Sequence, residues 1–312
     1  MSTLTPLKII AFPGAPNLPV YAALEQGLFA ALGLDVTLQT TPSSVFQIQA
    51  LHGGEFDLAF TAFDNVVAYR EGQGAAQLEG PCDFRVVMGA TQVELSAVVA
   101  PDVVAAQDLK GRSLALDAVG TGFAFVLYAM LKQLGLETAD YERVAVGATP
   151  ERWQAVKAGQ HAGTITIEPF TSIAQAAGFR VLARSSDHFA ACQGGIVAAR
   201  GAWIASYSSE LQAFIRGYLQ GLAWTLAPAN REAAAALLQA RMPEIKPGVV
   251  GAVMDSLLSP RSGLTPGAAV LHDGMQTVLD LRSQYGRGGQ PLRDVDRYLA
   301  LADWQAVTAA GA

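Results

Sequence analysis

Residues 8–35 read KIIAFPGAPNLPVYAALEQGLFAALGLD, and the hydrophobic pattern changes its period within them. A mainly apolar run over residues 7–12, interrupted only by Lys8, has the length of a buried β-strand. Apolar residues at three- and four-residue spacing over 18–32 indicate an amphipathic α-helix, and residues 35–39 form a second strand-length run. A strand, a helix and a strand in this order predict a βαβ unit with parallel strands.

The same alternation continues beyond this unit and predicts two sets of strands and helices. Extended segments near residues 86–92 and 194–199 would let the chain leave the first set, build the second and return. Two crossings of this kind indicate a hinge between two lobes. The further expected elements are strands over 57–60, 84–89, 113–116, 143–146, 164–167 and 180–183, and helices over 44–52, 63–71, 121–134, 150–158 and 170–177.

Long helices are expected from residue 206 onward. Leu211, Phe214 and Tyr218 follow one another at helical spacing, and further helices are expected over 231–241, 247–258 and 266–285. We expect these helices to cover the first lobe. The sequence thus predicts an α/β protein in which lobe one comprises residues 1–91 and 197–312, and lobe two comprises residues 92–196.

The amino-acid composition argues against several classes of protein function. Of 312 residues, 51% are hydrophobic and 15% are charged, which is typical of a chain with a large core and excludes disorder for most of it. The 21 Lys and Arg residues against 27 Asp and Glu, with no basic run, argue against nucleic-acid binding. No apolar run reaches the roughly 20 residues that a membrane helix needs. Cys82 and Cys192 have no metal-site spacing, so we expect free thiols and no metal.

Residues 1–6 carry neither the positive nor the apolar region of a secretory signal. We therefore expect either that a signal was removed or that the protein is cytoplasmic.

Residues 8–35 resemble the start of the solute-binding proteins of ABC importers, a group that includes binders of sulfonates, taurine, nitrate and thiamine pyrimidines. The likeness lies in a Glu-x-Gly-Leu-Phe phrase at residues 25–29 and Gly-Leu-Asp-Val at residues 33–36. It continues in Gly-Glu-Phe-Asp-Leu-Ala at 54–59 and Asp-Leu-Lys-Gly-Arg-Ser at 108–113. The resemblance implies a two-lobed, type II periplasmic-binding-protein fold, with two mixed sheets, a hinge and a ligand cleft between them.

The resemblance also implies a function. A monomer would capture a small polar organic molecule in the cleft by hinge closure and deliver it to an ABC permease, without a cofactor and without catalytic residues. P-loop, HExxH and GxSxG motifs are absent from the sequence. The same fold hosts decarboxylases and pyrimidine-synthesising enzymes, so a cytoplasmic ligand-binding or enzymatic member is the alternative. Such an enzyme would use Asp117, Glu168 or Asp64 as acid or base.

The candidate ligand-binding residues follow the strands, because ligands of open α/β sheets bind beyond the carboxyl ends of the strands. In lobe one, the loops after the first three strands contain Phe12, Asn17, Leu18, Ser43, Ser44, Thr61, Phe63 and Asp64. Asn17 and the two serines suit helix capping equally well. Phe63 could stack on a planar ligand or lie in the core.

In lobe two, the segment after the strand at 113–116 contains Asp117, Gly120, Thr121, Gly122 and Phe123, and Glu168 follows the strand at 164–167. The glycines would let backbone amides at a helix start approach a ligand. A dinucleotide fingerprint would need glycine at Phe125, which argues against a nucleotide cofactor. Glu168 could bind a ligand amine or cap the next helix.

The expected ligand is mostly planar and polar, with at most one acidic group. Helix starts favour an anion, whereas ionised Asp64, Asp117 and Glu168 would oppose a fully anionic ligand. No Lys or Arg is expected in the cleft.

Overall fold

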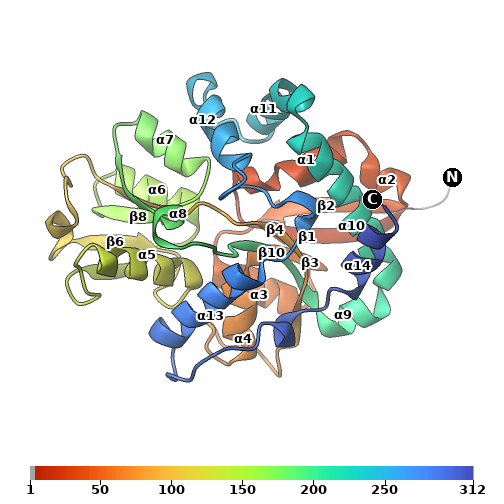
Figure 1. Ribbon diagram of the computed structural model, residues 1–312, viewed down its shortest axis with the longest axis horizontal. Helices are drawn as coiled ribbons and strands as arrows, with labels where there is room; N and C mark the ends of the chain where they lie inside the picture. The colour runs from red at the N-terminus through yellow and green to blue at the C-terminus, as the bar shows by residue number, and fades with distance from the viewer. Residues whose placement is uncertain (1–3, 312) are drawn as a thin grey trace.

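The computed structural model describes residues 4–311, and its strands form two five-stranded mixed sheets (Figure 1). The first sheet has the order β2-β1-β3-β10-β4 and consists of β1 (Thr5–Ala11), β2 (Leu34–Thr40), β3 (Leu58–Ala62), β4 (Phe84–Thr91) and β10 (Gly195–Arg200). The second has the order β7-β6-β8-β5-β9 and consists of β5 (Ser96–Val99), β6 (Ser113–Leu116), β7 (Glu142–Ala145), β8 (Gly163–Thr166) and β9 (Arg180–Arg184).

We call the first sheet, with the helices packed on it, lobe one, and the second sheet, with α5 to α8, lobe two. The helices before and after lobe two are α1 (Leu18–Glu25), α2 (Leu28–Ala31), α3 (Ser44–His52), α4 (Phe63–Arg70), α9 (Gly201–Ser206), α10 (Ser208–Leu226), α11 (Arg231–Arg241), α12 (Pro247–Leu257), α13 (His272–Tyr285) and α14 (Ala302–Ala309). Lobe two contains α5 (Gly122–Gln133), α6 (Thr149–Lys157), α7 (Phe170–Ala176) and α8 (Ser185–His188).

The two sheets share one plan. In lobe one, β1 runs parallel to β2 and β3, and β10 returns antiparallel between β3 and β4. In lobe two, β6 runs parallel to β7 and β8, and β5 lies antiparallel between β8 and β9. The reversed strands make both sheets mixed, which confirms the expected fold class.

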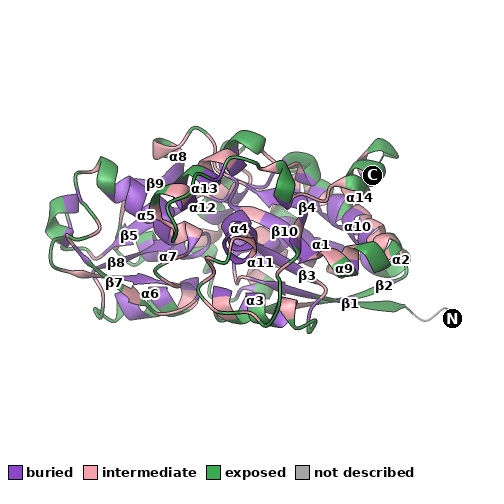
Figure 2. Ribbon diagram, turned by 90° about the horizontal axis from the view of Figure 1, so that it is seen from below, coloured by how far each residue is buried: buried purple, intermediate pink, exposed green. Residues whose placement is uncertain are grey.

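The hydrophobic core of lobe one has two layers, one on each face of its sheet. Leu7 and Ile9 of β1 pack into a cluster with Phe214 of α10, whereas Ile10 packs on the other face with Ile48 of α3. Figure 2 shows the buried residues concentrated on the strands and on the inner sides of the helices. Full burial of each such side chain stabilises the fold by about 1.5–3 kcal/mol, so the apolar runs place the strands in the centre of the lobe.

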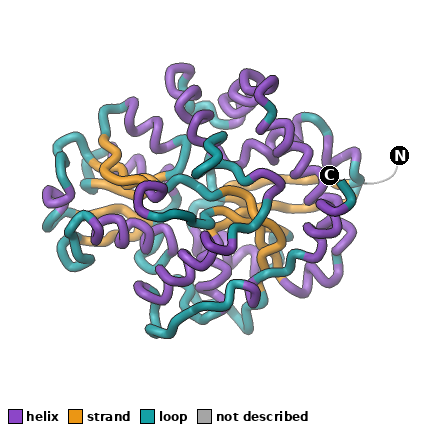
Figure 3. The backbone as a smooth tube through the Cα atoms, in the orientation of Figure 1, coloured by secondary structure: helices purple, strands orange, loops and turns teal. Residues whose placement is uncertain are grey.

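The crossings between the sheets lie at other residues than expected. Residues 86–91 and 195–199, expected in the connecting segments, are neighbouring antiparallel strands of lobe one, because Val86 and Met88 pair with Ala198 and Val197. The chain crosses over residues 92–95 and again over 189–194, between the two groups of strands in Figure 3. The expected lobe boundaries stay a prediction.

Two expected helices differ in the structure, and one observed strand was not expected. The helix expected over 18–32 is divided into α1 and α2 because Gly27 adopts a left-handed conformation, with φ 68°. The helix expected over 266–285 begins only at His272, after a short turn at Pro266–Ala268. The strand β5 was not expected, because a four-residue, fully buried run shows no alternation.

The C-terminal helices do not cover lobe one alone. Helix α13 packs on α4 of lobe one and on α5 of lobe two, and α12 contacts α7 of lobe two. In Figure 1 these two helices stand at opposite borders between the sheets. The C-terminal helices therefore connect the two lobes.

Candidate ligand-binding site

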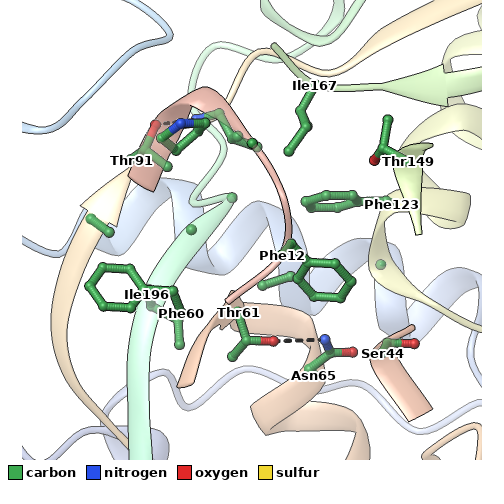
Figure 4. Close-up of a pocket in the computed structure, with 18 of the residues that line it drawn as sticks. Phe12, Ser44, Phe60, Thr61, Asn65, Thr91, Phe123, Thr149, Ile167 and Ile196 are labelled. Carbon is green, nitrogen blue, oxygen red and sulfur yellow. Dashed lines mark hydrogen bonds between the residues drawn. The ribbon is translucent and has the colours of Figure 1, made fainter. Parts of the chain in front are cut away.

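A pocket lies between the lobes at the carboxyl ends of β1, β3, β6 and β8 (Figure 4). Its cavity volume is about 80 Å³, and both lobes line it. Phe12, Phe60 and Thr61 belong to the wall of lobe one, and Phe123 and Thr149 belong to the wall of lobe two. The pocket thus occupies the position that the strand-end rule predicts.

Hydrogen bonds join the lobes around this pocket. They run from Ala15 N to Glu168 O at 3.0 Å, from Ala148 N to Pro42 O at 2.9 Å, and from Ser44 N to Asp117 Oδ2 at 3.1 Å. The last of these is charge-assisted, because the carboxylate of lobe two accepts a hydrogen bond from the N-terminus of α3. The lobes are therefore closed over the pocket.

Eight of the fourteen candidate residues line the pocket. They are Phe12, Asn17, Ser44 and Thr61 from lobe one and Asp117, Thr121, Gly122 and Phe123 from lobe two. The structure also resolves two of the capping alternatives. The amide of Asn17 donates to Phe12 O at 2.8 Å instead of capping α1, and Ser44 does not cap α3.

Three of the remaining candidates have structural roles in lobe one. Ser43 caps α3, since its hydroxyl accepts a hydrogen bond from Phe46 N at 3.1 Å. Leu18 is fully buried in the lobe-one core. Phe63 is also fully buried, with its ring edge-on to Tyr298 at 5.8 Å, so the core interpretation of this aromatic is the correct one.

Asp64 and Gly120 do not line the pocket because both contact Arg282 of α13. The two carboxylate oxygens of Asp64 accept from Arg282 at 2.5 and 2.6 Å, and Gly120 O accepts from it at 3.0 Å. Asp64 and Arg282 are almost completely buried, with 3% and 1% of their side chains exposed. The Asp64 charge is therefore balanced within the protein and does not oppose an anionic ligand.

Glu168 also lies outside the pocket, and its carboxylate is directed toward α7. It accepts hydrogen bonds from the hydroxyl of Ser172 at 3.0 Å and from Ser172 N at 3.3 Å, which favours the helix-capping interpretation. Burial raises the pKa of Glu168 to about 7, although the hydrogen bonds from Ser172 and the charge of Arg184 act in the opposite direction. A substantial fraction of this carboxyl is therefore protonated near neutral pH.

The structure adds a cation that the sequence analysis missed. Arg152 of α6 lines the pocket with 3% of its surface exposed, so the expectation of a cleft without Lys or Arg was wrong. Its donors reach Gly147 O at 2.7 Å, Ile165 O at 2.9 Å, and the hydroxyls of Thr149 and Thr164 at 3.0 and 3.1 Å. Burial lowers the pKa of Arg152 to about 10, and the charge of Asp117 opposes this shift.

Thr149 and Asn65 line the pocket but were not among the candidate residues. Thr149 supplies a hydroxyl group, and Asn65 donates a hydrogen bond to the hydroxyl group of Thr61. Thr149 follows the strand expected at 143–146, so the strand-end rule applied to that strand would have found it. Thr149 Oγ1 accepts a hydrogen bond from Arg152, which leaves its own hydrogen free to donate. Thr61 Oγ1 accepts from Asn65 Nδ2 at 2.9 Å in the same way (Figure 4).

Ser44 adds a third hydroxyl. Its side chain lines the pocket with 2% of the residue exposed, and Oγ has no hydrogen-bond partner among the described residues. A buried polar atom without a partner costs about 1–3 kcal/mol. This hydroxyl can be satisfied by a ligand in the pocket.

The described residues provide neither a group of side chains that could bind a metal ion nor a helix that could span a membrane. Within residues 4–311, no group of three or more His, Cys, Asp or Glu side chains is placed to hold a metal ion. In the same range no helix combines the length and the apolar character needed to cross a bilayer.

Two α/β lobes closed over a pocket between them define the class of periplasmic-binding-protein folds. The chain belongs to the NMT1-like family, whose model matches residues 2–239. No curated protein sequence matches the chain. The similarity to the solute-binding group that the sequence indicated is thereby confirmed at the level of family and fold.

Solved structures with this fold include binding proteins and an enzyme. The periplasmic nitrate-binding protein of Synechocystis has a TM-score of 0.81 at 13% identity, with 99% of this chain and 89% of that chain covered. The alkanesulfonate-binding protein of Xanthomonas axonopodis pv. citri has a TM-score of 0.72 at 18% identity, with 91% and 94% covered. A desulfurization enzyme has a TM-score of 0.66 at 13% identity, with 99% and 100% covered.

Proposed function

We propose that this protein is the solute-binding component of an ABC importer and that it encloses a small polar organic molecule between its lobes. The observation that carries the proposal is the closed pocket, in which both lobes supply walls and Ser44 presents a buried hydroxyl without a partner. A ligand that contacts both lobes stabilises the closed state more than the open state, which is the requirement for capture by hinge closure.

The dimensions of the pocket support a small, flat ligand. A cavity of about 80 Å³ has room only for a small molecule, since one water molecule takes up about 30 Å³ in the liquid. Figure 4 shows the rings of Phe12 and Phe123, one from each lobe, among the side chains at its centre. Such rings favour contact with a planar molecule.

The charges of the pocket support a ligand with at most one acidic group. The buried cation of Arg152 lies in the same pocket as the carboxylate of Asp117, so the two charges offset each other. The hydroxyls of Ser44, Thr61 and Thr149 can donate to an acceptor group of the ligand. Asp117 would oppose a dianion.

The proposal extends to location and partners. The nitrate-binding neighbour is a periplasmic protein and another neighbour is a ligand-binding component of an ABC-type import system, which supports a periplasmic location and delivery of the ligand to an ABC permease. We also propose that the protein acts as a monomer.

The pocket supports binding more than catalysis. Three carboxylates were considered as acid or base, but among the described residues only Asp117 lines the pocket, because Asp64 pairs with Arg282 and Glu168 faces Ser172. A general acid or base must lie within hydrogen-bond reach of the proton that it transfers. Of the three carboxylates, Asp117 alone meets this requirement in the pocket, and it already accepts a hydrogen bond from Ser44 N.

A thermal-shift panel tests the proposal. It contains alkyl sulfonates, nitrate, aromatic carboxylates and pyrimidines, and it compares the parent with Thr121→Ala, which alters the pocket, and Glu168→Ala, which lies outside it. We expect planar compounds with one acidic group or none to stabilise the parent, and Thr121→Ala but not Glu168→Ala to lose this shift. The ligand assignment is wrong if inorganic or alkyl anions stabilise best. Solute capture itself is contradicted if Thr121→Ala keeps every shift that the parent shows.

A further inference from the structure

The start of α5 touches lobe one at a place with no room for a side chain. An ideal Cβ built on Gly122 would lie 2.3 Å from Asp64 Cβ and 2.5 Å from Asp64 Cγ. Its three nearest neighbours all belong to Asp64, which is part of α4 in lobe one. Gly122 is the first residue of α5, where alanine would suit the helix itself better than glycine. The contact between the lobes therefore requires glycine at position 122, whereas the conformation of α5 does not.

Asp64 cannot swing away from this contact. Both of its oxygens accept hydrogen bonds from Arg282, and the pair is almost completely buried. The guanidinium and carboxylate meet through two parallel bonds, which fixes their relative orientation. Asp64 therefore presents a rigid surface to Gly122.

Arg282 lies on α13, which packs on both lobes, and it joins Asp64 of lobe one to lobe two. Its Nη2 donates to Gly120 O at 3.0 Å, and its guanidinium carbon lies 4.8 Å from the ring centre of Phe125. The Asp64–Arg282 pair thus meets residues 120–125 of lobe two at three points, namely a carbonyl, a glycine without clearance and an aromatic ring.

We propose that the Asp64–Arg282 pair is the seat on which residues 120–125 come to rest when the cleft closes, and that it positions Thr121 and Phe123 around the ligand. This role rests on the solute capture proposed above. Thr121 and Phe123 flank Gly122 in the sequence and line the pocket. The seat therefore sets how far the lobes close, and Asp64 and Arg282 are positioning residues that do not line the pocket.

A matched pair of variants tests the seat. Gly122→Ala adds a methyl group that collides with Asp64, whereas the same substitution at Gly120 meets nothing within 4 Å. Closure is measured without ligand, as the rate at which a short bis-maleimide joins cysteines placed at Pro42 and Glu151. These exposed positions face each other across the closed cleft, since an ideal Cβ on Gly147 lies 3.2 Å from Pro42 O and 3.7 Å from Glu151 Cβ.

The cross-linking is carried out on a background in which both native cysteines are replaced, as Cys82→Ser and Cys192→Ala, because both thiols are partly exposed. We expect Gly122→Ala to slow cross-linking about tenfold or more and Gly120→Ala to leave the rate unchanged. Equal rates in both variants and the parent would overturn the proposal.

Two further outcomes are informative. If Gly122→Ala melts at a lower temperature but cross-links at the parent rate, the contact lies within one rigid body and the proposal is wrong. If Gly122→Ala does not fold, Arg282→Lys decides, since lysine retains the charge beside Asp64 but loses the fork that also reaches Gly120. Arg282→Lys should then slow cross-linking, and an unchanged cross-linking rate would overturn the proposal. Because no ligand enters the measurement, its result is independent of whether solute capture is correct.

Discussion

Ser43 and Ser44 are adjacent serines for which the structure predicts opposite effects of the same substitution. The hydroxyl of Ser44 is buried without a partner, so Ser44→Ala removes a desolvated polar atom. The backbone N–H of Ser44, which donates to Asp117, is retained. We therefore expect the free energy of unfolding of the ligand-free protein to rise by about 1–3 kcal/mol.

Ser43→Ala should act in the other direction. Its hydroxyl accepts the hydrogen bond from Phe46 N that caps α3, and loss of such a cap costs about 1 kcal/mol. Ser43 does not line the pocket, so ligand binding should not change.

Urea unfolding measures both stabilities, and titration calorimetry with the best compound of the thermal-shift panel measures both affinities. We expect Ser44→Ala to be more stable than the parent but to bind about tenfold more weakly, because it loses a hydrogen bond to the ligand. Ser43→Ala should be less stable with unchanged affinity. The reasoning is refuted if Ser44→Ala lowers stability, or if it binds the ligand as tightly as Ser43→Ala does.

Other consequences concern pH, the buried cation and closure. Folding raises the pKa of Glu168 from its ordinary 4.5 to about 7, because the buried site favours the protonated carboxyl. The free energy of unfolding is therefore highest, as far as this group is concerned, below pH 4.5. It falls by at most about 3 kcal/mol as the pH rises through 7. Glu168→Gln should therefore be more stable than the parent at pH 8 and equal to it near pH 4.5 in urea unfolding, whereas the exposed control Glu232→Gln should change neither. Arg152→Leu should lower the free energy of unfolding by about 2–4 kcal/mol in the same assay, because it leaves buried acceptors unpaired; a cost below about 1 kcal/mol would contradict the described hydrogen bonds. A ligand from the panel should reduce the radius of gyration of the parent protein in small-angle scattering, and an unchanged radius would count against capture by closure.

The order of strands and helices could be predicted because it depends on local periodicity. The helix Ser44–His52 and the strand Ser113–Leu116 have the bounds that the pattern predicts. The break at Gly27 and the short strand β5 could not be predicted, because a helix pattern tolerates an isolated glycine and a four-residue buried run has no periodicity.

The strand-end rule located the pocket but could not say which residues face it. Asp64 and Glu168 follow strands as expected, yet their partners remove them from the pocket. Arg282 is 218 residues away from Asp64 in the chain, so no local pattern reveals the pair. Arg152 was missed for a related reason, because a charged residue in the first turns of a helix gives no sign in the sequence that it is buried.

Native mass spectrometry of the protein as purified tests the central claim, solute capture in the pocket between the lobes, most directly. The parent is compared with Ala62→Phe, in which the larger side chain at the end of β3 would occupy part of the pocket. We predict that the parent carries a small organic molecule that is released on denaturation and that Ala62→Phe carries none. The claim is contradicted if the parent carries no such molecule and binds no compound of the panel, or if Ala62→Phe carries the same molecule to the same extent.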